Sequence, residues 1–257
     1  MPEIRMVMPG STLSTDMGGV SFCNVFLIEG ERRILFDSSH VGRRRALVSK
    51  LGELGVSPAD IDAQVLSHAH WDHVQNIDLF QHAPLLVHGR ERSYVRDPHH
   101  NDFATPPWTE AILDLMDIRE VGEGFEVMPG CRVIELPGHS AGSIGLEVET
   151  DDGLCIISGD AVRAADAALS RRATLIFWNE EQADASVRRV ADSGAIIYPG
   201  HDRPFRIRDG EAHYTMDYPI TVNGAPGVTF DADPPPAQRW VMPGIEDQRL
   251  DAPAAGA

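Results

Sequence analysis

The segment from His68 to His73 reads His-Ala-His-Trp-Asp-His and concentrates four side chains that bind metal ions. On an extended loop, residues two positions apart point the same way, so His68 and His70 can share one ion. Where the chain turns into a helix, Asp72 and His73 can face a second ion. Imidazole suits zinc, iron and nickel, and a carboxylate adds a hard oxygen that can steer a bound water. This spacing predicts a metal centre.

Three further candidate ligands each follow an apolar, strand-like run and a glycine. They are His139 after V-I-E-L-P-G, Asp160 after C-I-I-S-G and His201 after I-I-Y-P-G. Glycine lets the backbone turn sharply at a sheet edge and approach an ion closely, and ligands at strand ends converge in a rigid site. Alone, each would be an ordinary histidine or turn residue, and the first segment a histidine-rich surface loop. Their recurrence favours a single metal site.

Strands and helices must alternate to bring these ligands together, which predicts an α/β fold. Strands are expected at 22–29, 33–36, 64–66 and 84–88, then at 125–127, 132–136, 144–149, 154–157 and 195–198. Helices are expected at 42–55, 74–80, 110–116 and 179–191. Residues 97–108 mix proline, histidine and aromatic side chains and predict a long loop, a kind of segment that often carries function.

Composition limits the class of protein and its partners. The chain of 257 residues has a net charge of -17, which disfavours nucleic acid, and its one basic run is Arg43–Arg45. We expect one catalytic domain over 1–222 and a Pro/Ala-rich tail over 223–257, most of it loosely packed. No apolar run reaches the roughly 20 residues of a membrane helix. The three cysteines have no metal-like spacing and, with no signal pattern at the N-terminus, predict a cytoplasmic protein with free thiols.

The chain resembles the metallo-β-lactamase superfamily over about residues 20 to 205. That family's ligand pattern is H-x-H-x-D-H, then a later His, a later Asp and a final His, and all seven positions occur here in order. The resemblance implies a four-layer αββα sandwich and a supporting role for Asp37, which ends the strand R-I-L-F-D. It also implies the ligand assignment of one metal on His68, His70 and His139, the other on Asp72, His73 and His201, and Asp160 as a bridge.

Within the superfamily, the chain is most similar to the N-acyl-homoserine-lactonase-like branch of small-molecule hydrolases. The similarity lies in segments 57–62, 137–143 and 198–202 and in the helix predicted over 179–190. Two positions depart from the family. Val74-Gln75-Asn76 stands where the family usually has a glycine, and Asp160-Ala161-Val162-Arg163 lacks the tyrosine that helps quorum-signal lactonases hold substrate. The ligands therefore predict the metal chemistry and leave the substrate open.

This resemblance implies a binuclear hydrolase that acts on a small ester or lactone. Two divalent ions roughly 3.5–4 Å apart lower the pKa of a shared water to about 7, and the resulting hydroxide attacks the carbonyl carbon. Asp72 can orient that hydroxide and pass a proton to the leaving group. Zinc is the default metal, and manganese or iron could occupy the same ligands. The alternatives are a thioester, amide or phosphodiester hydrolase of the same fold, or an iron-dependent redox enzyme.

Four other side chains are candidates for contact with a small-molecule substrate. Tyr94, Phe103 and Trp108 could line a pocket, with plain packing of the loop as the alternative. Arg163, close to the bridging aspartate, could bind a substrate carboxylate or serve only at the surface. The loop at 97–108 and the tail are candidates for a homodimer contact.

Overall fold

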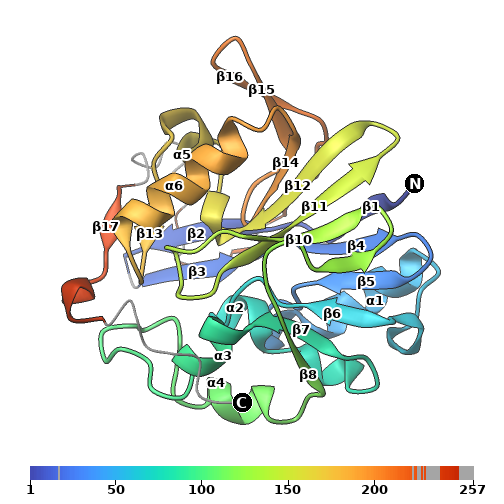
Figure 1. Ribbon diagram of the computed structural model, residues 1–257, viewed down its shortest axis with the longest axis horizontal. Coiled ribbons are helices and arrows are strands. Elements are labelled where there is room, and N and C mark those ends of the chain that lie inside the picture. The colour runs from blue at the N-terminus through green and yellow to red at the C-terminus, as the bar shows by residue number, and fades with distance from the viewer. Residues whose placement is uncertain (17, 222, 225–226, 228, 230–237, 249–257) are drawn as a thin grey trace.

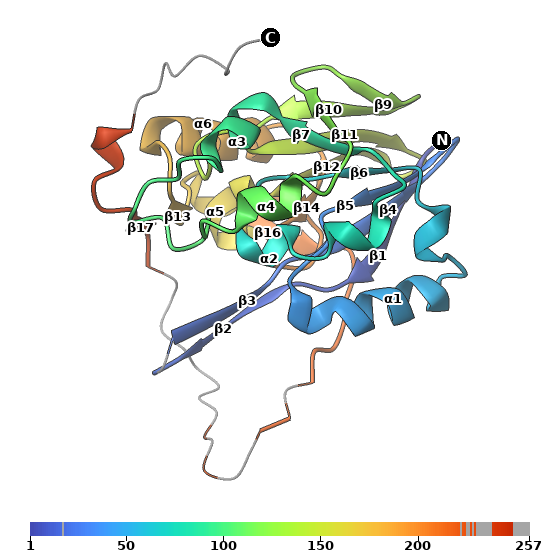
Figure 2. The ribbon, with the colours of Figure 1, turned by 90° about the horizontal axis from the view of Figure 1, so that it is seen from below.

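The computed structural model describes residues 1–16, 18–221, 223–224, 227, 229 and 238–248. Two mixed β-sheets lie face to face, with helices on their outer faces (Figures 1 and 2). This is the four-layer αββα sandwich that the sequence predicts. The ligand-bearing loops lie along one edge of the two sheets.

The first sheet has six strands in the order β1-β4-β5-β6-β7-β8. Its strands are β1 (Glu3–Met8), β4 (Val25–Glu29), β5 (Arg33–Phe36), β6 (Ala63–Val65), β7 (Leu85–His88) and β8 (Ile118–Val121). β1, β4 and β5 pair antiparallel, whereas β5 through β8 pair parallel. The parallel strands therefore all end at the same edge.

The second sheet has seven strands in the order β16-β15-β14-β12-β11-β10-β9. Its strands are β9 (Glu126–Met128), β10 (Cys131–Glu135), β11 (Ile144–Thr150), β12 (Gly153–Gly159), β14 (Ile196–Pro199), β15 (Phe205–Arg208) and β16 (Glu211–Tyr214). β11 is antiparallel to both β10 and β12, and β12 is parallel to β14. Hence β10, β12 and β14 run in one direction, and each of them precedes a candidate ligand.

The period-two alternation of strand residues builds the layers. On β4, Phe26 and Ile28 face the core between the two sheets, whereas Val25 and Leu27 face the layer of α1 (Arg44–Glu53). On the far side, α5 (Ala165–Ser170) and α6 (Glu180–Ala191) cover the second sheet. All three cysteines are buried free thiols, as predicted for Cys23 and Cys155.

The single helix expected at 74–80 is wrong. The chain forms a short α2 (Trp71–Val74) and a 3-10 turn (Ile77–Phe80) that are separated at Asn76. The buried Asn76 amide donates hydrogen bonds of 2.8–3.2 Å to the carbonyl oxygens of Ser38, Ser39 and His40. Because Asn76 is committed to the loop after β5, the helix stops before it.

The helix predicted at 110–116 begins earlier and ends earlier, as α4 (Thr109–Leu113). The strand predicted at 22–29 is interrupted at Cys23 and Asn24, so that β3 (Gly18–Phe22) forms a hairpin with β2 (Ser11–Thr15). The Asn24 amide donates to the carbonyl oxygens of Pro199 (2.7 Å) and Asp202 (2.8 Å), which fixes this break against the loop after β14.

Residues 238–248 of the predicted tail pack against the catalytic unit, which differs from the expected loose packing. β17 (Trp240–Val241) pairs in parallel with β13 (Leu175–Ile176). Arg239 donates to Asp184 at 2.7 Å, and Gln248 donates to the Phe177 carbonyl at 2.5 Å. The rest of the predicted tail, except 223–224, 227 and 229, lies outside the described residues, and its boundary at 223 stays a prediction.

Among the described residues, no helix is long and apolar enough to cross a membrane.

Candidate metal centre

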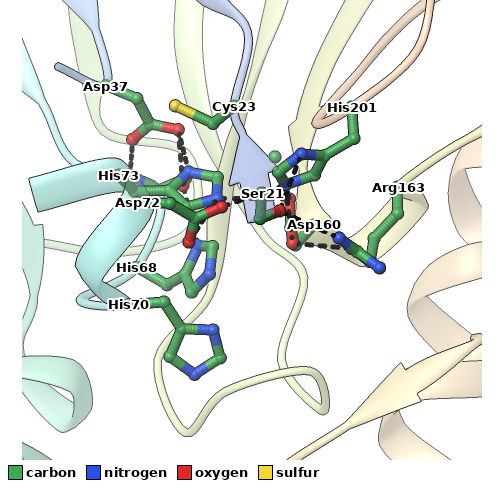
Figure 3. Close-up of polar contacts among 12 residues, drawn as sticks. Ser21, Cys23, Asp37, His68, His70, Asp72, His73, Asp160, Arg163 and His201 are labelled. Atoms are coloured by element: carbon green, nitrogen blue, oxygen red, sulfur yellow. Dashed lines mark hydrogen bonds and ion pairs between the residues drawn. The ribbon is translucent and has the colours of Figure 1, made fainter. Parts of the chain in front are cut away.

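The structure brings all seven predicted ligands together at the edge where the parallel strands end. His68 and His70 lie in the loop after β6, and Asp72 and His73 lie on α2. The other three follow β10, β12 and β14, and Figure 3 shows most of the set converging. Each of the seven is at most 7% exposed; they are His68, His70, Asp72, His73, His139, Asp160 and His201.

Two glycines permit this close approach. Gly138, before His139, has a φ of 124°, and a Cβ built there would lie 2.0 Å from the Ala183 nitrogen on α6. A Cβ on Gly200, before His201, would lie 2.1 Å from Oδ1 of Asp160. Only a residue without a side chain fits at either position, because a side chain would meet α6 at Gly138 and the Asp160 carboxylate at Gly200.

One group of ligand atoms consists of three imidazole nitrogens. His139 Nε2 lies 3.2 Å from His68 Nε2 and 3.0 Å from His70 Nδ1. All three rings are buried, and the three nitrogens satisfy the spacing expected around one ion. His70 thus presents Nδ1 to the group, whereas His68 and His139 present Nε2.

A second group combines a carboxylate with two histidines. Asp72 Oδ2 lies 3.6 Å from His201 Nε2, and Asp72 Oδ1 lies 3.8 Å from His73 Nε2. These three side chains also satisfy the spacing expected around one ion. A carboxylate with two imidazoles is a donor set that divalent transition metals commonly take.

Asp160 lies between the two groups. Its Oδ1 is 3.0 Å from His201 Nε2 and 3.4 Å from His73 Nε2. Its Oδ2 is 3.6 Å from His139 Nε2 in the first group. The placement of one carboxylate against both groups matches the bridging role that the family resemblance implies.

Most of these histidines are fixed through the ring nitrogen that faces away from the centre. His68 Nδ1 lies 2.9 Å from the Ser67 hydroxyl and His139 Nδ1 lies 2.8 Å from the Leu175 carbonyl. His201 Nδ1 lies 3.0 Å from the Phe22 carbonyl. Such outward bonds set which nitrogen carries the proton, and therefore which one can bind a metal.

Asp37 supports the centre, as predicted. It follows β5, and its Oδ2 accepts a 2.7 Å hydrogen bond from His73 Nδ1 and one of 2.8 Å from the Ser67 hydroxyl. Its Oδ1 accepts from the Ser67 backbone N–H at 2.8 Å. One buried carboxylate thus fixes both His73 and the start of the loop that carries His68.

The electrostatics of the centre favour a cation. Burial, reinforced by the neighbouring histidines, holds the pKa values of His68 and His70 well below the ordinary histidine value, so both rings are neutral with a free lone pair. Burial alone would raise the pKa of Asp160, but His201 and His73 lower it well below the ordinary carboxyl value. The pKa of Asp72 is lowered in the same way, against burial, by His73 and His201.

The pKa of His73 is shifted in the opposite direction by neighbouring negative groups. Burial would lower its pKa, but Cys23 and the carboxylates of Asp37, Asp160 and Asp72 raise it well above the ordinary value. His73 Nε2 and Asp160 Oδ1 are nevertheless buried without a hydrogen-bond partner. A buried polar atom without a partner is costly. A divalent cation would satisfy both atoms, so the residues fit bound metal.

The structure gives the four predicted substrate residues different surroundings. Arg163 donates to Asp160 Oδ2 at 3.0 Å and to the Thr12 and Ser21 hydroxyls at 3.2 and 3.3 Å, so it is tied to the centre and to the β2–β3 hairpin. Tyr94 donates to Asp102 at 3.0 Å, and this contact commits its hydroxyl to the protein. A role of these residues in substrate binding stays a prediction.

The two remaining candidates are exposed. Phe103 is 66% exposed, and its ring lies 5.3 Å from Phe177 and 5.5 Å from Trp240. Phe177 in turn packs edge-on against His70, with ring centroids 4.6 Å apart, so an aromatic path connects Phe103 to the first group. Trp108 is 45% exposed and directly precedes α4.

Sequence reasoning missed several residues that shape the centre. Glu91, on α3 (Gly89–Tyr94), is fully buried and accepts from the Ala69 and Gly142 N–H groups and the Ser140 hydroxyl, each at 2.8 Å. It thereby joins the loops that carry His70 and His139. A single charged residue on a short helix gives no periodic signal, so nothing in the sequence marks it.

A family model described as the metallo-beta-lactamase superfamily matches residues 18–201. The chain belongs to the metallo-β-lactamase superfamily. Metallo-beta-lactamase domain-containing protein 1 of Xenopus laevis is 33% identical over 202 residues, which cover 76% of this chain and 78% of that protein. An N-acyl homoserine lactonase of Bacillus thuringiensis is 27% identical over 165 residues, which cover 61% of this chain and 62% of the lactonase.

Solved structures share the fold. A metallo-beta-lactamase-like protein of Thermotoga maritima superimposes with a TM-score of 0.66 at 19% identity, covering 80% of this chain and 99% of that one. A B. thuringiensis AiiA mutant with bound N-decanoyl-L-homoserine gives a TM-score of 0.63 at 22% identity, covering 78% and 92%. The family and these relatives identify the protein as a metallo-β-lactamase superfamily hydrolase, with His and Asp clusters suited to divalent metal.

Proposed function

We propose that the seven side chains hold two divalent ions and that the protein hydrolyses a small ester or lactone. The observation that carries this proposal is Asp160, whose two oxygens face two separate ligand groups, one of them made of three histidines. Similarity to N-acyl homoserine lactonases supports a lactone or ester as substrate. Zinc suits the histidine-rich donor set, and manganese or iron are the alternatives.

The chain's own residues supply the proton handling. When bound, two such ions supply Lewis acidity, which lowers the pKa of water to about 7 and polarises a carbonyl oxygen. Asp72 stays ionised because His73 and His201 lower its pKa, so its carboxylate can accept a hydrogen bond from the attacking water and orient it. It can also pass a proton from that water to the leaving oxygen. Arg163 holds Asp160 in place through its 3.0 Å contact.

The net charge of -17 supports a small-molecule substrate over nucleic acid. A cytoplasmic location and a homodimer stay predictions. A thioester, amide or phosphodiester substrate uses the same water chemistry, and an iron-dependent redox reaction would use the same ligands. Turnover and metal content must separate these alternatives.

The test combines metal analysis of the purified protein with a panel of a lactone, a thioester and bis-nitrophenyl phosphate. We expect two equivalents of a divalent metal and the fastest turnover on the lactone. Phosphodiester turnover without lactone turnover would overturn the substrate class. A single iron with oxygen consumption would favour the redox reaction.

His70→Ala tests the centre itself. It should lose metal and activity together, because it removes one of the three converging nitrogens. His82→Ala is the control, since the one hydrogen bond of the His82 side chain among the described residues is to the Ile61 carbonyl at 3.0 Å, outside the centre. Full activity and metal content in His70→Ala would refute the proposed ligand set.

A further inference from the structure

His70 differs from the other four histidines of the centre in the surroundings of its outward ring nitrogen. In the other four, the nitrogen that faces away from the centre lies within 3.0 Å of an oxygen acceptor. His70 presents Nδ1 to the other two nitrogens of its group, so in the neutral ring that can bind a metal the proton must lie on Nε2. Yet Nε2 is buried and, among the described residues, has no hydrogen-bond partner.

A buried carboxylate faces this nitrogen. Asp102 Oδ2 lies 4.0 Å from His70 Nε2, and the Asp102 side chain is fully buried. A shift of about 1 Å would bring the two atoms to the roughly 2.9 Å of a normal hydrogen bond. Because an unpaired buried N–H is costly, forming this bond is favourable.

The surroundings of Asp102 hold it in position for this contact. Its Oδ1 accepts from the backbone N–H groups of Ala104 at 2.9 Å and Thr105 at 3.0 Å. Its Oδ2 accepts from the Tyr94 hydroxyl at 3.0 Å, which leaves a second lone pair on that oxygen. The Tyr94 ring packs edge-on against Trp178, with centroids 5.6 Å apart. All hydrogen bonds donated to the carboxylate therefore come from fixed groups.

We propose that Asp102 is a positioning residue that accepts the Nε2 proton of His70 and thereby fixes the tautomer in which Nδ1 binds metal. Tyr94 acts through Asp102 by holding its carboxylate in place. This inference rests on the proposed metal centre. The proposal gives a role to the loop at 97–108, which the sequence predicts to be irregular. It also makes Tyr94 a residue that supports the ligand His70 through Asp102.

The alternative is that Asp102 serves only its own loop, by accepting the two backbone N–H groups. In that case Asp102→Asn would change the stability of the protein but not its affinity for metal. If Asp102 positions His70, the amide of the variant places a donor against the Nε2 proton. The ring then favours the other tautomer, whose Nδ1 carries a proton and cannot bind.

The test measures Zn²⁺ binding to the metal-free protein by competition with a chromophoric chelator. Outward partners of metal-binding histidines typically contribute 10–100-fold to metal affinity. We therefore expect Asp102→Asn to bind one of two Zn²⁺ ions about 10–100-fold more weakly, and Tyr94→Phe to show a smaller loss at the same ion. Tyr214→Phe is the matched control, since Tyr214 makes the same 3.0 Å contact to a different aspartate, Asp202.

Wild-type affinity for both ions in Asp102→Asn would overturn the inference. If that variant does not fold, as judged by its thermal unfolding without metal, Tyr94→Phe decides, and unchanged affinity there has the same meaning. The Zn²⁺ binding assay contains no substrate, so a failure of the lactone panel would not affect its result. A wild-type protein that binds no Zn²⁺ would instead refute the proposed centre, and with it this inference.

A spectroscopic signature separates positioning from general loosening. In the Co²⁺-loaded protein, the outward imidazole N–H protons give shifted signals in the proton NMR spectrum. We expect one signal, that of His70, to be lost in Asp102→Asn, while those of His68 and His139, which have their own partners, remain. Equal changes in all signals would contradict a specific role for Asp102.

Discussion

Replacing Asp37 with asparagine should weaken metal binding without unfolding the protein. The aspartate accepts three buried hydrogen bonds, two from Ser67 and one from His73 Nδ1. Its φ of 59° lies in the left-handed region, which asparagine tolerates better than most residues. Asp37→Asn therefore changes the hydrogen bonding while sparing the backbone, whereas alanine would add strain.

Either orientation of the new amide disrupts one of these hydrogen bonds. With the amide nitrogen at the Oδ1 position, it faces the Ser67 N–H. With the nitrogen at the Oδ2 position, it faces His73 Nδ1, and the histidine proton must move to Nε2, the atom that would bind metal. One unsatisfied buried N–H costs about 1–3 kcal/mol, which corresponds to about 5- to 150-fold in affinity.

The assay is chelator competition for Zn²⁺ with the metal-free protein, together with thermal unfolding. We expect the loss at the ion bound by His73 and a smaller effect at the other. Asp62→Asn is the control, because among the described residues the Asp62 carboxylate accepts one hydrogen bond, from the exposed backbone N–H of Arg33 at 2.7 Å. If both ions bind Asp37→Asn as tightly as the wild type, then Asp37 does not determine the tautomer of His73, and the reasoning is wrong.

Three further predictions concern pH and packing. The raised pKa of His73 means that its proton stabilises the metal-free protein below the ordinary value of about 6.5 and that this contribution is lost as pH rises through the raised value. Since metal must displace that proton, Zn²⁺ affinity should increase up to about tenfold per pH unit between pH 6 and 8, and a flat chelator-competition profile would contradict this. Gly138→Ala should yield little folded protein on expression, because the new Cβ would lie 2.0 Å from a backbone nitrogen of α6; a soluble, fully active variant would show that the loop can move. Asn76→Ala should lower the free energy of unfolding in urea by about 1–3 kcal/mol, because three carbonyl oxygens lose their donor, and an unchanged midpoint would mean that water replaces the amide.

The positions of the candidate ligands could be predicted because they depend on strand direction. His139, Asp160 and His201 each follow a strand, and the three strands β10, β12 and β14 run in the same direction. Apolar runs and the glycines after them mark such strand ends in the sequence. Convergence at one edge then follows from the sheet topology.

The supporting residues could not be predicted in the same way. Asp102 and Glu91 lie 32 and 21 positions beyond His70, in a loop and on a short helix without periodicity, and their partners are mostly backbone groups. Any acidic residue in such segments reads as solvated until the fold shows it buried. The contact of Trp240 with Phe177 could not be predicted either, because it depends on how the chain returns after the second sheet.

This return of the chain places aromatic rings between the exposed surface and the candidate metal centre. The Phe177 ring lies 4.6 Å from His70 and 5.5 Å from His139 on one side, and 5.0 Å from Trp240 and 5.3 Å from Phe103 on the other. Close packing transmits displacement between neighbours. A change in the C-terminal segment or in the exposed Phe103 therefore reaches the three-histidine group through one ring, so variants of Phe103 or Trp240 must be judged by metal content as well as by activity.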